Sequence, residues 1–132
     1  GEEDSPSKFI PFIINKIKSN ESNLDLTPGL QIRDFIYVKD VVSAFEDAIS
    51  SFDNLIQYQE FQVGTGLSCT IKDLAIAIKE ITNSSTVLNF GGLAYRDGEI
   101  MESKVDDFGL KKIGWHSNYT LNEGLKNCID NE

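Results

Sequence analysis

Two arginines carry the most specific chemistry in this sequence. Ten of the twelve basic residues are lysines, and only Arg33 and Arg96 are arginines, each close to an aromatic residue. A guanidinium offers a planar fork of N–H donors that matches phosphate oxygens, whereas a lysine ammonium is a solvated point charge. Two such forks converging on one cleft would hold a diphosphate. The alternative interpretation is a pair of surface or salt-bridged arginines.

Arg33 lies in a stretch that predicts a strand followed directly by a helix. Residues 31–38 include aromatic and β-branched side chains, which favour a pleated strand. Asp40 then opens a helix, where its carboxylate suits the positive end of the helix dipole. Spacings of three and four predict one apolar face on this helix, made of Val41, Val42, Phe45, Ala48, Ile49 and Phe52.

The rest of the chain alternates in the same way. Apolar periodicity predicts helices over residues 8–18, 70–81, 106–113 and 120–129, and short strands over 24–26, 61–63 and 87–90. Thr70 with Asp73, and Thr120 with Glu123, have the spacing of capping boxes. The order is mixed α/β, with short strands alternating with helices, and residues 1–132 have the length of one domain.

Composition argues against several classes of function. The net charge of −9 and the pI near 4.5 lack the basic footprint of a protein that binds nucleic acid or anionic membranes. No apolar run approaches the ~20 residues that span a bilayer. Cys69 and Cys128 predict two reduced thiols in the cytosol, and the carboxylates lack metal-ligand spacing. Residues 64–66, Gly-Thr-Gly, fit a tight turn better than a phosphate loop.

Several motifs together resemble one family. Arg33-Asp34-Phe35-Ile36-Tyr37-Val38-Lys39-Asp40-Val41 is similar to "RDFIYVxDV", a signature of the extended short-chain dehydrogenases/reductases. These are NAD-dependent nucleotide-sugar epimerases, dehydratases and 4-keto reductases. Further matches follow in the family's order at residues 61–66 ("FNVGTG"), 71–78 ("SIKELAEAI"), 95–99 ("RxGE/D"), 110–115 ("LKKLGW") and 121–125 ("LEEGL").

The resemblance also shows what this sequence lacks. The family's Gly-rich cofactor loop and its catalytic Tyr-x-x-x-Lys are absent. The resemblance therefore implies the C-terminal, substrate-binding half of such an enzyme, without a complete Rossmann domain and without catalytic, cofactor or metal residues of its own. NAD or NADP would be bound mainly by a preceding domain, and the isolated chain would be inactive. A non-catalytic nucleotide-binding or protein-interaction module that retains the fold is the alternative.

The resemblance assigns roles to individual residues. It implies that Arg33 and Arg96 contact the diphosphate of a nucleotide-diphosphate sugar, and that Glu99 bonds the ribose. It places an aromatic, Phe35, near the nucleotide, and a segment along the base that consists of Phe9, Ile10 and Pro11. It further implies a cytoplasmic, homodimeric full-length enzyme. The apolar face over residues 41–52 would pack on the absent half, so that the isolated chain could self-associate.

Overall fold

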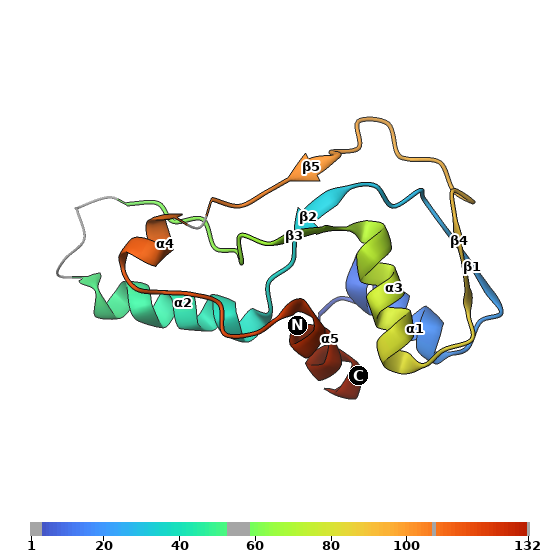
Figure 1. The fold of residues 1–132 in the computed structure, drawn as a ribbon, viewed down its shortest axis with the longest axis horizontal. Coiled ribbons are helices and arrows are strands. Elements are labelled where there is room, and N and C mark those ends of the chain that lie inside the picture. Colours follow the sequence, from blue (N-terminus) through green and yellow to red (C-terminus); the bar gives the residue numbers. More distant parts are fainter. Residues whose placement is uncertain (1–3, 53–58, 107, 132) are drawn as a thin grey trace.

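The computed structural model describes residues 4–52, 59–106 and 108–131. It confirms a mixed α/β architecture of short strands and helices (Figure 1). The helices are α1 (Phe9–Lys18), α2 (Val38–Ser50), α3 (Ile71–Thr82), α4 (Phe108–Lys112) and α5 (Leu121–Asn131). The strands are β1 (Asn23–Leu26), β2 (Ile32–Asp34), β3 (Ser68–Thr70), β4 (Val87–Phe90) and β5 (Glu102–Ser103).

The described strands form two small sheets. β1 pairs in parallel with β4, and β2 lies at the centre of a second sheet in the order β3-β2-β5. In that sheet β2 runs antiparallel to β3 and parallel to β5. The chain segment between β4 and β5 therefore starts in one sheet and ends in the other, passing along one side of the molecule (Figure 1).

Two clusters of buried side chains stabilise the fold. The larger lies among α1, α3, α5 and β1 and includes Ile13, Ile17, Leu74 and Ile78, all fully buried. The smaller consists of Ala44, Leu110 and Trp115 and joins α2 to α4 at the other end of the molecule (Figure 1). The Trp115 indole N–H donates to the Ser43 hydroxyl at 2.9 Å, which satisfies the one polar group of that buried ring.

The predicted helix starts are confirmed where a capping box was predicted. At α3 the Thr70 hydroxyl accepts from the Asp73 amide, and the Asp73 carboxylate accepts from the Thr70 amide. At α5 the Glu123 carboxylate accepts from the Thr120 amide at 2.8 Å and from the Thr120 hydroxyl at 2.7 Å. Both boxes use residues three apart in sequence, so local spacing determines them.

The predicted strand over residues 31–38 is too long. β2 ends at Asp34, and α2 already begins at Val38. The Asp34 carboxylate binds the turn at residues 64–66, and the Tyr37 ring turns inward to meet Tyr119 at a ring-centroid distance of 4.8 Å. Because of these two contacts, residues 35–37 leave the sheet after Asp34.

The strand predicted over residues 61–63 is wrong. These residues have no strand pairing, although Phe61 and Val63 pack against the smaller buried cluster. Their apolar side chains are thus explained by burial rather than by a β ladder. The strand in this part of the chain is β3, which starts at Ser68.

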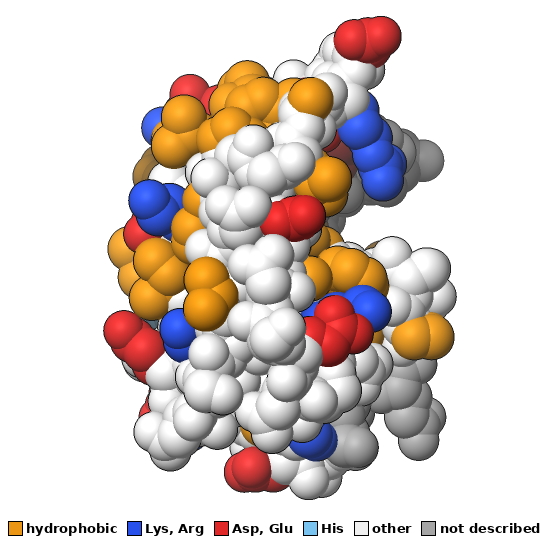
Figure 2. All heavy atoms as spheres, turned by 90° about the vertical axis from the view of Figure 1, so that its right-hand side faces the viewer, with side chains coloured by type: hydrophobic (Ala, Val, Ile, Leu, Met, Phe, Trp, Pro, Cys, Tyr) orange, Lys and Arg blue, Asp and Glu red, His pale blue; other side chains and the backbone are white. Residues whose placement is uncertain are grey.

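α2 turns much of its apolar face toward solvent. Phe45 is 64% exposed, Ile49 72% and Phe52, just beyond the helix end, 74%. Large exposed apolar patches are uncommon on monomeric proteins and mark surfaces that bind something. The face of the molecule over β1 and β4 differs, because there hydrophobic side chains alternate with both acidic and basic ones, without a continuous basic patch (Figure 2).

Candidate functional site

Arg33 is held by the segment that joins β4 to β5. Its Nη2 donates to Glu99 Oε1 at 3.3 Å and also to the Ile100 carbonyl, while Nη1 donates to its own neighbour, the Ile32 carbonyl, at 2.8 Å. The side chains of Arg33 and Glu99 are 26% and 25% exposed. The structure thus brings together two of the predicted site residues, which stand 66 positions apart.

Backbone pairing explains why these two residues meet. Ile32 donates to the Met101 carbonyl at 2.8 Å, and the parallel β2–β5 ladder places Arg33 opposite Ser103. On the other side, the Leu30 amide donates to the Tyr95 hydroxyl at 3.0 Å. The segment at 91–103 is therefore hydrogen-bonded both to β2 and to Leu30 just before it, and Glu99 lies between these two points.

Arg96 belongs to the same segment but is held differently. The Glu99 amide donates to the Arg96 carbonyl at 3.1 Å, and Gly98 has a φ of +74°, so residues 96–99 form a tight turn. The Arg96 side chain is exposed. Within the described part of the chain, its guanidinium has no ion pair or hydrogen bond, which leaves its donors available to a ligand.

The predicted apolar site residues are part of the core. Pro11 is buried in the first turn of α1, and Phe9, Ile10 and Phe35 pack against the larger buried cluster. Ile10 and Phe35 also line one small cavity of about 50 Å³. These contacts give all four residues a structural role, and their contact with a nucleotide stays a prediction.

Asp34, the neighbour of Arg33, binds the turn at residues 64–66, a role that the sequence did not predict. Its carboxylate accepts from the Thr65 amide at 3.0 Å, from the Thr65 hydroxyl at 2.7 Å and from the Gly66 amide at 2.8 Å. The turn at residues 64–66 thus binds an internal carboxylate with the amides that a phosphate loop would use. The available signal was an acidic residue next to Arg33 and a Gly-Thr-Gly sequence whose amides need an acceptor.

A cavity of about 270 Å³ lies between this turn and the start of α5. Burial raises the pKa of the Cys69 thiol there, and the nearby Asp73 and Asp34 carboxylates raise it further. The protonated thiol is a poor nucleophile at neutral pH. The cavity is lined by Phe35, Thr65, Leu67, Ser68, Cys69, Ser117, Asn118, Tyr119, Thr120 and Leu121.

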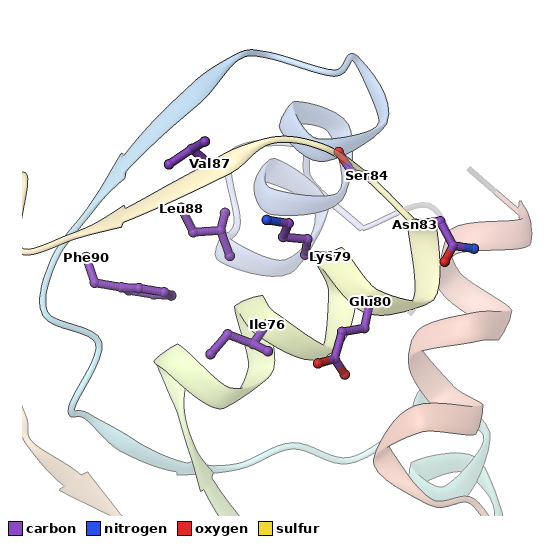
Figure 3. A pocket seen from close by; sticks show the side chains of 8 residues that line it. All are labelled: Ile76, Lys79, Glu80, Asn83, Ser84, Val87, Leu88 and Phe90. Atoms are coloured by element: carbon purple, nitrogen blue, oxygen red, sulfur yellow. The ribbon is translucent and has the colours of Figure 1, made fainter.

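A larger, open groove of about 620 Å³ lies between α3 and β4. Leu88 and Phe90 of β4 approach Ile76 of α3 from the opposite wall (Figure 3). The predicted site residues do not line this groove, and its two charged residues, Lys79 and Glu80, have opposite signs. The groove therefore has no chemistry that selects an anion.

None of the described helices is long and apolar enough to cross a membrane. The His, Cys, Asp and Glu side chains of residues 4–52, 59–106 and 108–131 form no group of three or more that could hold a metal ion.

The sequence of the Arg33 region matches a known family. Residues 1–64 match the model of the NAD dependent epimerase/dehydratase family. CDP-abequose synthases are similar along nearly the whole chain: that of Salmonella muenchen is 40% identical over 98% of this chain and 43% of its own length. The enzyme of Salmonella typhimurium is 36% identical over 98% of this chain and 44% of its own length.

These matches relate the chain to the NAD dependent epimerase/dehydratase family. A solved UDP-glucose 4-epimerase from Thermotoga maritima, in complex with UDP-glucose, has a TM-score of 0.82 at 25% identity, covering 99% of this chain and 42% of that one. A UDP-glucuronic acid 4-epimerase from Bacillus cereus shares the fold, with a TM-score of 0.86 at 22% identity over 99% of this chain and 41% of that one. The chain thus spans less than half the length of these similar proteins.

Proposed function

We propose that this chain is the C-terminal, substrate-binding part of an NAD(P)-dependent nucleotide-sugar epimerase, dehydratase or 4-keto reductase. The observation that carries the proposal is the 40% identity to a CDP-abequose synthase over 98% of the chain, a stretch that includes Arg33, Arg96 and Glu99. The substrate class is a nucleotide-diphosphate sugar, and a CDP-sugar is the first candidate.

The proposed role of the site is to hold the nucleotide as a handle. Arg33 and Arg96 contact the diphosphate, and Glu99 accepts a hydrogen bond from the ribose. Binding energy from this part of the substrate, remote from the reacting carbon, fixes the position of the sugar. Phe35 and residues 9–11 support the nucleotide side of the site.

The cofactor belongs to another part of the enzyme in this proposal. Nicotinamide supplies hydride chemistry when it is bound. The one glycine turn that resembles a dinucleotide loop, at residues 64–66, already donates two amides to Asp34. The described residues therefore do not fit a dinucleotide site, and no hydride step is derived from them. We expect the 132-residue chain alone to be inactive.

Calorimetry with the protein as its gene encodes it tests the proposal. CDP, UDP and dTDP are titrated in parallel, with cytidine as the control that lacks phosphate. We expect CDP to bind and cytidine to bind at least tenfold more weakly, because the nucleoside leaves both arginines without a partner. Equal affinity for CDP and cytidine would contradict a diphosphate site.

A second measurement separates the enzyme from a non-catalytic module. The encoded protein is tested for NAD(P) binding, and its upstream coding sequence is read for a Gly-rich loop and a Tyr-x-x-x-Lys motif. Both features are expected for the enzyme, and their absence would favour a module that only binds the nucleotide. Turnover of a nucleotide sugar by the 132-residue chain alone would show that the chain is not merely the substrate-binding part.

A further inference from the structure

We propose that Arg33 and Glu99 form an exchangeable ion pair, in which a bound diphosphate displaces Glu99 from the Arg33 guanidinium. This inference rests on the proposed function and adds a step to it. The two residues predicted to bind different parts of the nucleotide bind each other here, at 3.3 Å. The pair therefore competes with a two-pronged contact between Arg33 and the diphosphate.

The donors of Arg33 show why an exchange is needed. A guanidinium has five N–H donors, and it can bind an anion in bidentate fashion along the Nη1–Nη2 end or the Nε–Nη2 side. Both edges include Nη2. The two hydrogens of Nη2 are engaged, one by Glu99 Oε1 and one by the Ile100 carbonyl. Arg33 thus cannot grip a phosphate through two adjacent nitrogens until one of these bonds opens.

Geometry identifies the bond to Glu99 as the one that opens. Ile100 is a backbone acceptor next to Met101, whose carbonyl is fixed by the Ile32 amide at 2.8 Å. Glu99 is an acceptor on a flexible side chain, its bond is the longer of the two, and a quarter of its side chain is exposed. An ion pair with this access to water contributes little to stability, so an incoming dianion can replace it.

The exchange has a consequence for affinity. While Glu99 is paired with Arg33, the carboxylate cancels the positive charge of that arginine. An incoming anion then meets only the charge of Arg96, on a chain whose net charge is −9. Displacement frees the Glu99 oxygens on the same turn as Arg96, whose carbonyl accepts from the Glu99 amide. The carboxylate is then available to a ribose hydroxyl. Glu99 consequently opposes the diphosphate and favours the ribose.

Inorganic pyrophosphate separates these two effects because it has no ribose. The test compares the encoded protein with its Glu99→Gln and Glu102→Gln variants by calorimetry. Glu102 is the matched control: it lies on β5, its pair with Lys104 is more exposed, and its substitution removes the same charge. We expect Glu99→Gln to bind pyrophosphate about two- to fivefold more tightly than Glu102→Gln, because an ion pair with access to water contributes at most about 1 kcal/mol. In an Arg33→Gln background this difference should vanish.

The results distinguish this inference from the proposed function. Equal pyrophosphate affinity in Glu99→Gln and Glu102→Gln, weaker binding by Glu99→Gln, or undetectable pyrophosphate binding in a protein that binds CDP overturns the exchange alone. Failure of the encoded protein to bind CDP, UDP and dTDP overturns the proposed function. Thermal unfolding of each variant verifies that it is folded, and a Glu99→Ala variant, which also lacks the charge, must tighten pyrophosphate binding as Glu99→Gln does.

Discussion

Arg33 and Arg96 are held differently by the fold, so their lysine variants should differ. Arg96 is exposed and unpaired among the described residues, whereas Arg33 makes three hydrogen bonds. We expect Arg96→Lys to weaken binding of a nucleoside diphosphate by about 1–3 kcal/mol without changing the unfolding temperature. Arg33→Lys should weaken binding similarly and also lower the free energy of unfolding, by about 1 kcal/mol.

Calorimetry and thermal unfolding on the same protein preparations measure both effects. Lys39→Arg on the exposed start of α2 serves as a control for lysine–arginine exchange away from the site. Unchanged nucleotide affinity in Arg96→Lys would remove Arg96 from the site. A loss of stability in that variant would show that its side chain is a structural group.

Asp40 is a buried charge that accepts hydrogen bonds from the backbone of a distant segment. It is fully buried, and its carboxylate accepts from the amides of Asn118 at 2.8 Å and Tyr119 at 3.2 Å. It thus links the start of α2 to the segment before α5. Asp40→Asn replaces one acceptor oxygen with a donor that faces an amide. We expect a loss of about 1–3 kcal/mol in the free energy of unfolding.

Urea denaturation measures this loss, with Asp47→Asn as the control. Asp47 lies on the same helix and is exposed, so the same change of charge there should alter stability by less than about 0.5 kcal/mol. Equal effects at the two positions would mean that helix charge, rather than the two buried hydrogen bonds, accounts for the role of Asp40.

At the scale of one element, the start of α5 makes stability depend on pH. Hydrogen bonds from the Thr120 amide, and then from its hydroxyl, lower the pKa of Glu123 below its ordinary value of 4.5. Because the folded-state pKa is the lower one, the stabilisation is present above the unfolded pKa and is lost as the pH falls through the folded value. The stability of α5 should therefore decrease in acid.

Urea unfolding followed from pH 7 to about pH 3 measures this loss. Glu123→Gln should have a smaller decrease in stability over the acidic range than the unmodified chain. Glu80→Gln, an exposed change of equal charge on α3, should keep the full decrease. The same acid dependence in all three proteins would exclude a contribution from the Glu123 cap.

The elements that local sequence could predict are those built from neighbouring residues. The capping boxes at Thr70 and Thr120 are examples, because both partners lie within one turn. The length of β2 was not predictable in this way. It depends on Asp34 reaching a turn 31 and 32 residues away, and on Tyr37 meeting Tyr119.

The sequence suggested which residues belong to the candidate site, but not how they contact one another. Residue types and the family resemblance suggested Arg33, Arg96 and Glu99 as site residues, and their contact with a nucleotide stays a prediction. The ion pair between Arg33 and Glu99 depends on β5. β5 has two residues and no apolar pattern, so sequence periodicity could not find it. The pairing of β2 with β5 joins residues about 70 positions apart, so neighbouring residues do not determine it.

At the scale of the whole molecule, the two buried clusters leave one long apolar surface uncovered. Val38, Val42, Phe45, Ile49 and Phe52 follow one another at spacings of four, three, four and three, and each is at least 40% exposed. This spacing matches the seam of two packed helices. A second copy of the chain can offer the same seam in return, because a two-fold dimer uses one surface twice.

We therefore expect the 132-residue chain to self-associate through α2. Sedimentation velocity should show a concentration-dependent dimer for the unmodified chain and a monomer for Phe45→Glu, because a charge at the centre of the seam cannot be desolvated without a partner. Phe45 is 64% exposed, so its replacement leaves both buried clusters intact. Leu67→Glu, which changes a more exposed apolar residue outside α2, should still dimerise. A monomer at all concentrations, or equal dimerisation by Phe45→Glu, would contradict pairing through this helix.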